Sequence, residues 1–155
     1  MKNILLAIAL AAYTGLAAQS TNELVVTNFD GTVVTAAEKV KSLEANRKRA
    51  DLTIMLGWWR DNIRYCKVAM LNYETTKSAD SIETAEGCHI NAEKAYNELM
   101  QSIKAIELLA KDEKLKKEAQ KIKQKVVEMK AGDKLVKWHD SCFIPKMTVH
   151  GTPLQ

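Results

Sequence analysis

Apolar residues recur at steps of three or four positions through most of this chain, and this spacing constrains its fold more than any other feature. Proline, which interrupts helices, does not occur before residue 145. The repeat separates into three stretches, 40–73, 85–110 and 115–129. Each stretch would place its apolar residues on one face of a helix, and that face needs a partner to cover it. The sequence therefore predicts an all-α fold, an antiparallel bundle of three long helices with room for a short fourth.

Residues 24–35 have a different pattern, LVVTNFDGTVVT. Two β-branched runs flank Asp30 and Gly31, and Asp-Gly is a favoured centre for a tight hairpin turn. Thr35 and Glu38 then have the spacing of a capping box, in which each side chain bonds an amide of the first helical turn. We expect a small β-hairpin or extended segment, followed by a helix that begins after Thr35.

The first eighteen residues, MKNILLAIALAAYTGLAA, have the layout of a secretory signal peptide. A basic residue, Lys2, precedes an apolar run that is shorter than the roughly 20 residues of a membrane span, and small residues precede a cleavage site after Ala18. We expect a secreted or periplasmic protein whose mature form does not span a membrane. Its parts would be an N-terminal segment (19–35), a helical bundle domain (36–140) and a flexible tail (141–155).

The chain has three cysteines. Cys66 and Cys88 lie on the apolar stripes of the first two helices, and they would face each other if the turn between those helices were centred on Lys77. Facing cysteines in an exported protein are expected to be oxidised, so we predict a disulfide between Cys66 and Cys88. Cys142 is left unpaired or as an alternative partner, and an odd cysteine also permits a disulfide-linked homodimer.

The segment Ala85-Glu86-Gly87-Cys88-His89 allows two other interpretations. Cys88 followed by His89, with Ala85 at the first position of the motif, resembles the single-thioether haem attachment of a rare branch of cytochrome c. Glu86 and His89 have the spacing of one ligand pair of a di-iron bundle, but no second such pair occurs. A disulfide explains Cys88 better, so we expect no haem and no bundle metal.

The C-terminal part holds a second set of metal-ligand types, namely His139, Asp140, Cys142 and His150. Their spacing is irregular, and a disulfide through Cys142 would remove the best zinc ligand. The chain also lacks a glycine-rich phosphate loop, a Gly-x-Ser-x-Gly elbow and a His-Glu-x-x-His motif. We therefore expect neither a metal or other cofactor nor catalysis.

Two surfaces are candidates for binding. Trp and Arg are common at binding hot spots, and the predicted interaction patch contains Trp58, Arg60 and Arg64. Residues 111–137 hold ten lysines and only five acidic residues, and the predicted basic ridge contains Lys114, Lys117 and Lys121. Such a ridge suits an anionic envelope or cell-wall component, or an acidic protein.

Loss of Lys2 with the signal peptide would lower the formal charge from +4 to +3, which is too small to indicate nucleic-acid binding. We expect an exported helical bundle that binds another macromolecule. The alternatives are a membrane-anchored coiled-coil spacer that keeps residues 1–18, and a haem-binding bundle.

Overall fold

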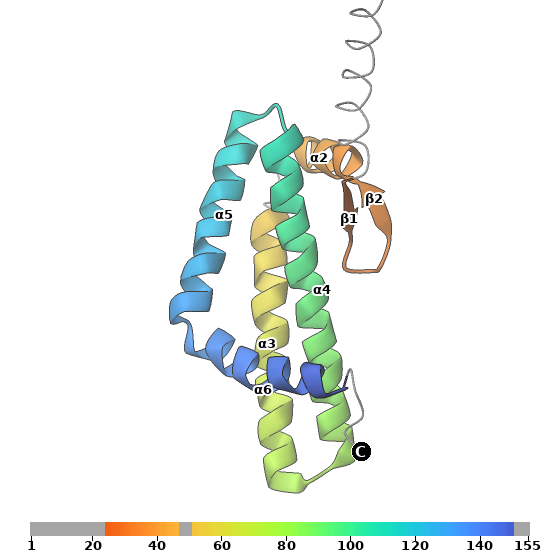
Figure 1. Ribbon diagram of the computed structural model, residues 1–155, viewed down its shortest axis with the longest axis vertical. Coiled ribbons are helices and arrows are strands. Elements are labelled where there is room, and N and C mark those ends of the chain that lie inside the picture. The colour runs from red at the N-terminus through yellow and green to blue at the C-terminus, as the bar shows by residue number, and fades with distance from the viewer. Residues whose placement is uncertain (1–23, 47–50, 151–155) are drawn as a thin grey trace, which may run out of the picture.

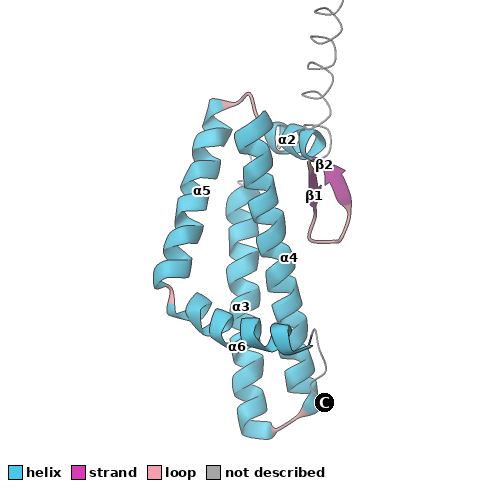
Figure 2. Ribbon diagram, viewed as in Figure 1, coloured by secondary structure: helices cyan, strands magenta, loops and turns pink. Residues whose placement is uncertain are grey.

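The computed structural model describes residues 24–46 and 51–150, with side chains described as far as residue 142. The elements in order are β1 (Val25–Thr27), β2 (Val33–Thr35), α2 (Ala36–Ala45), α3 (Asp51–Thr76), α4 (Ala79–Leu109), α5 (Glu113–Gly132) and α6 (Lys134–His150). Figure 1 shows α3 and α4 side by side at the centre, and Figure 2 shows how little of the described chain is not helical. The predicted helical bundle with a small N-terminal hairpin is confirmed.

Helices α3 and α4 form an antiparallel pair joined by a very short turn. Lys77 lies in this turn in the left-handed region, at φ 55°, and its N–H donates to the carbonyl of Tyr73 at 2.8 Å. The interior between the helices includes Ile63 of α3 and Leu99 and Ile103 of α4, which are almost completely buried. Burial of such side chains is the main stabilising contribution to a bundle of this kind.

Different elements cover opposite sides of the α3–α4 pair. On α4, Glu98 contacts the hairpin and His89 contacts α6. These two residues are nine positions apart, so they project about half a turn from each other. Glu107 of α4 pairs with Lys123 of α5. Accordingly, α5 and α6 lie on one side of the pair, and the hairpin with α2 lies on the other (Figure 1).

The hairpin is present, but its turn is not centred on Asp30 and Gly31. Gly31 donates its N–H to the carbonyl of Asn28, so the central residues are Phe29 and Asp30. Gly31 follows at φ 88°, a conformation that glycine adopts without steric cost. This arrangement is typical of a longer hairpin loop with a glycine after the turn. After the hairpin, the predicted capping box of Thr35 and Glu38 starts α2 and is confirmed.

Two predicted boundaries differ from the structure. The stretch 40–73 is not one helix: α2 ends at Ala45, and α3 begins at Asp51. Apolar residues on both sides of the break are buried, but the step from Leu43 to Leu52 is nine positions rather than three or four, a lapse in the repeat that the prediction did not use. At the other end, α6 extends to residue 150 and includes the first ten residues of the predicted flexible tail, 141–155.

The predicted signal peptide, residues 1–18, lies outside the described residues. Within the part of the chain that is described, no helix is both long enough and apolar enough to cross a bilayer.

Candidate functional site

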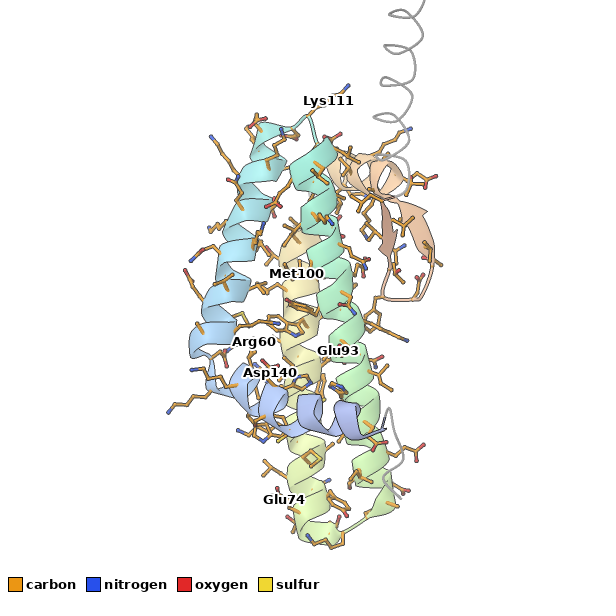
Figure 3. The ribbon with its side chains drawn as sticks, viewed as in Figure 1. Arg60, Glu74, Glu93, Met100, Lys111 and Asp140 are labelled. Atoms are coloured by element: carbon orange, nitrogen blue, oxygen red, sulfur yellow. The ribbon has the colours of Figure 1, made fainter. Side chains whose placement is uncertain are left out.

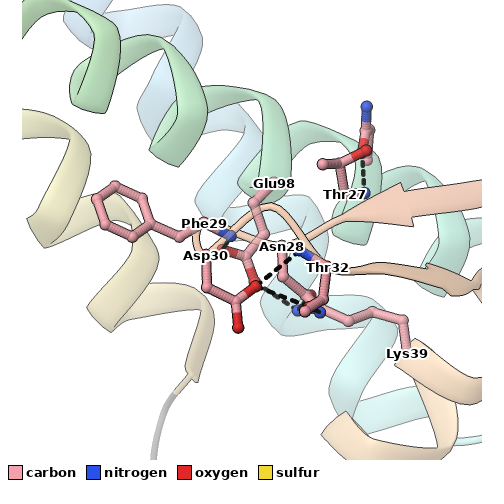
Figure 4. Close-up of polar contacts among 8 residues, drawn as sticks. Thr27, Asn28, Phe29, Asp30, Thr32, Lys39 and Glu98 are labelled. Carbon is pink, nitrogen blue, oxygen red and sulfur yellow. Dashed lines mark hydrogen bonds and ion pairs between the residues drawn. The ribbon is translucent and has the colours of Figure 1, made fainter.

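The hairpin is fixed to α4 by a buried carboxylate. One oxygen of Glu98 accepts the backbone N–H of Phe29 at 2.8 Å, and the other pairs with the ammonium group of Lys39 from α2 (Figure 4). The Lys39 ammonium also donates to Asn28 at 2.7 Å. Gln101, one turn further along α4, accepts the N–H of Thr27. These contacts place the hairpin over only one end of the α3–α4 pair.

The region of the α3–α4 pair that the hairpin covers ends at an aromatic contact. The ring of Phe29 packs on Trp58 of α3, with 5.8 Å between ring centroids. Trp58 remains 48% exposed. Beyond it toward the C-terminal end of α3, Tyr65 and Val68 follow at helical spacing and are 61% and 58% exposed. Tyr65, seven residues after Trp58, returns to nearly the same direction, and Val68 lies about 60° further around α3.

A groove runs between α3 and α4 beside these exposed residues. Its volume is about 390 Å³, and its lining is mostly apolar. The lining residues are Tyr65, Val68, Ala69 and Asn72 from α3, and Asp80, Ser81, Thr84 and Cys88 from α4. We call this groove, together with Trp58, the open face of the α3–α4 pair.

The cysteines lie beneath and beside the open face. Cys66 is completely buried, donates to the Ala85 carbonyl at 3.4 Å and is in hydrogen-bonding contact with Cys88. Cys142 packs against the same small apolar cluster. All three are free thiols, so the predicted Cys66–Cys88 disulfide is not present in this structure. Burial raises the pKa of Cys66 to about 12 and also raises that of Cys88, which makes both thiols poor nucleophiles.

On the opposite side of the pair, two histidines join α6 to α4. His89 Nδ1 and His139 Nε2 are 2.9 Å apart, and both side chains are buried. Asp140 lies beside His139, at 3.6 Å from its Nδ1. Burial lowers the pKa of both imidazoles, and for His139 the neighbouring His89 lowers it further. Figure 3 labels Glu93 and Asp140 where α6 crosses α4.

The structure does not bring the predicted interaction patch together. Trp58 contacts the hairpin, whereas Arg60 pairs with Asp133 at the corner between α5 and α6, at 3.3 Å. Arg64 pairs with Asp61 on its own helix. Residues two positions apart on a helix project in nearly opposite directions, so Trp58 and Arg60 lie on different sides of α3.

The predicted basic ridge is exposed on α5. Lys114, Lys117 and Lys121 all face solvent, and none of them pairs with a carboxylate among the residues whose side chains are described. Nearby Lys116 and Lys123 do have such partners, Glu113 and Glu107.

The residues considered as alternative metal or haem ligands do not all lie together. Cys88 faces Cys66, and His89 bonds His139. Cys142 packs near Cys66, and the side chain of His150 lies outside the described residues. Among the side chains that are described, no three or more His, Cys, Asp or Glu groups are arranged to hold a metal ion.

Two features of the site were missed by the sequence interpretation. Tyr65 and Val68 are large side chains outside the main apolar repeat, and this was a usable signal of an uncovered face. The contact between His89 and His139 joins residues fifty positions apart, and no local pattern predicts it.

No protein-family model matches the chain, and neither a curated protein nor a solved structure is significantly similar to it.

Proposed function

We propose that this is an exported protein that acts by binding an α-helix of another protein on the open face. The observation that carries the proposal is the groove between α3 and α4, with Tyr65 and Val68 more than half exposed beside it. Large apolar side chains next to an apolar groove are typical of an interaction site. A groove between two helices suits the apolar face of a third helix.

The geometry of the bundle supports a helical occupant. The other side of the same helix pair is covered by helices of this chain, α5 and α6. A partner helix on the open face would complete a similar layer, because ridges of side chains on one helix pack into the grooves of another.

The charge around the groove favours a basic partner. Asp80 lines the groove, and Asp61 lies one turn before Tyr65 on the same side of α3. Both side chains are exposed. Asp61 is already paired with Arg64, so the carboxylate that attracts a cation of the partner is mainly that of Asp80. The expected partner helix has apolar residues at steps of three and four, flanked by Lys or Arg.

Export is the second part of the proposal, and it rests on the signal-like sequence of residues 1–18. In an oxidising compartment an external disulfide oxidant would convert the Cys66 and Cys88 thiols to a disulfide, with the loss of two hydrogens. Cys88 lines the groove and Cys66 lies behind it, so the bond would fix α3 to α4 directly beneath the binding site. N-terminal sequencing of the exported protein should begin at Gln19.

A defined peptide tests the binding site. The probe is an 18-residue helical peptide with leucines at helical spacing and lysines elsewhere, and a scrambled peptide of the same composition is its control. Val68→Gln removes apolar surface from the open face, whereas Val127→Gln makes the same change at an equally exposed position on α5, 56% against 58%. We expect Val68→Gln to weaken binding about tenfold, the loss of roughly 1.4 kcal/mol that one well-buried contact provides, and Val127→Gln to leave it unchanged. Equal effects of the two substitutions, or equal binding of the scrambled peptide, would rule out the open face as the site that binds the helix.

A further inference from the structure

The His89–His139 contact has a chemical requirement that depends on pH. The two nitrogens are 2.9 Å apart, and a hydrogen bond between imidazoles needs one N–H donor and one acceptor nitrogen. When only one of the two rings is protonated, the bond can be kept, provided that one of the two contacting nitrogens still carries a hydrogen and the other does not. A doubly protonated pair has no acceptor nitrogen and places two cations in contact.

A charge on His89 opposes a second charge on His139, because it lowers the pKa of that ring, whereas the nearby carboxylates favour protonation. From α4, Glu93 exerts an attractive effect on both protonated rings, and from α6, Asp140 lies 3.6 Å from His139. From α3, Lys67 lies over the ring of Trp138, next to His139 in the chain. From α5, Lys130 lies over Tyr96 of α4. The thiols of Cys66, Cys88 and Cys142 are further titratable groups near this crossing.

We propose that the hydrogen bond between His89 and His139 is an acid-sensitive latch that holds α6 across α3 and α4. Beneath α6 lies the smaller of two apolar clusters, which is built on Cys66, Ala69 and Ala85. The larger cluster contains Leu99 and Ile103, and near the start of α6 it also includes Val136. Release of α6 would therefore expose the smaller cluster and the part of the larger cluster around Val136, and would leave most of the core in place.

The direction of the pH effect follows from proton binding. Burial lowers the pKa of both histidines below the ordinary value of about 6.5, so the state with α6 released binds more protons than the docked state. The docking of α6 has its full stability at pH values above the ordinary histidine pKa. Its stability falls as the pH drops below that value and continues to fall until the pH passes the lowered pKa values.

Hydrogen exchange on the purified full chain tests the latch. Amide exchange, corrected for the intrinsic effect of pH, is compared between about pH 7.5 and about pH 5. We expect residues 134–142 to lose protection about tenfold or more at the lower pH, and residues 99–106 to keep theirs. In His139→Gln the side chain can still bond His89 but takes up no proton, so the protection of 134–142 should depend on pH less steeply than in the wild type, through His89 alone. His150→Gln, at the third histidine of the chain, should respond as the wild type does.

Ring titration of the wild type by NMR provides a measurement that needs no variant. The imidazoles of His89 and His139 should take up protons in the same pH interval in which residues 134–142 lose protection. The latch is excluded if α6 stays protected at about pH 5, if 99–106 open together with it, or if His139→Gln keeps the wild-type pH response. It is also excluded if both rings remain neutral while α6 opens.

Discussion

Phe29, at the tip of the hairpin, packs its ring on Trp58 of α3 with 5.8 Å between the ring centroids. This contact is the edge of the hairpin's cover over the α3–α4 pair. On one side of it, Glu98 and Gln101 bond the hairpin backbone. On the other side lies the groove of the open face. The short N-terminal hairpin thus determines how much of the helix pair is left for a partner.

Glu98→Gln should loosen the hairpin. The substitution removes the negative charge that pairs with the buried ammonium of Lys39, while an amide oxygen can still accept the N–H of Phe29. Because Asn28 still accepts from Lys39, we expect a loss of about 2 kcal/mol rather than the larger cost of an unaccompanied buried charge. Chemical denaturation measures this loss.

Glu107→Gln is the matched control for that experiment. Its partner Lys123 is at a similar distance, 2.8 Å, but the pair is exposed, so the expected loss is below about 1 kcal/mol. Equal losses of unfolding free energy in the two variants would mean that burial of the Glu98–Lys39 pair adds nothing to its contribution to stability.

Gly31→Ala should lower the free energy of unfolding by about 1 kcal/mol, because a side chain is strained at φ 88°. Chemical denaturation measures this loss.

Gly87→Ala should have the opposite effect on stability. Gly87 lies inside α4, and an added Cβ would meet no atom within 4 Å. Alanine is the better helix former, so thermal denaturation should show a gain of up to about 1 kcal/mol there. A loss at Gly87 would contradict the open surroundings of that residue.

Ser102→Ala should be neutral or stabilising. The Ser102 hydroxyl is buried and has no hydrogen-bond partner among the described residues. Removing a buried polar group without a partner avoids its desolvation cost, which is about 1 kcal/mol or more. The melting temperature of the variant should not fall. A clear decrease would mean that the hydroxyl has a stabilising partner.

Cysteine oxidation is measurable by intact mass before and after reduction. We expect the exported protein to be two hydrogens lighter before reduction, and peptide mapping should join Cys66 to Cys88. Cys142→Ser should keep this difference, whereas Cys88→Ser should lose it. A doubled mass before reduction would indicate an intermolecular bond instead, and no mass change would show that the thiols stay reduced.

The helical content could be predicted because each helix has an apolar face of regular spacing. The stretches 85–110 and 115–129 correspond closely to α4 and α5, and the capping box located the start of α2. The break between α2 and α3 was missed although the repeat lapses there: Leu43 and Leu52 are both buried but lie nine positions apart, with mostly polar residues between them.

The candidate site was predicted less well, for two physical reasons. Trp58 and Arg60 were grouped because they are close in sequence, although a helix turns by about 100° per residue and separates them. The groove of the open face depends on where the hairpin stops covering the helix pair, which is set by contacts such as Glu98 with Phe29 across sixty-nine positions. Helical periodicity carries no information about contacts of this range.

The most direct measurement is photo-crosslinking in the producing cells, with a photoreactive amino acid at Tyr65 in the open face or, as a control, at Val127 on α5. A helix-binding open face predicts a discrete crosslinked product from position 65 whose attached peptide is amphipathic and basic, and no such product from position 127. Adding Val68→Gln should reduce the yield of the product, in line with the tenfold weaker binding expected, while the far-ultraviolet circular dichroism stays unchanged. Crosslinking from position 127 but not from position 65, or an attached peptide without helical amphipathicity, would contradict the proposed binding site.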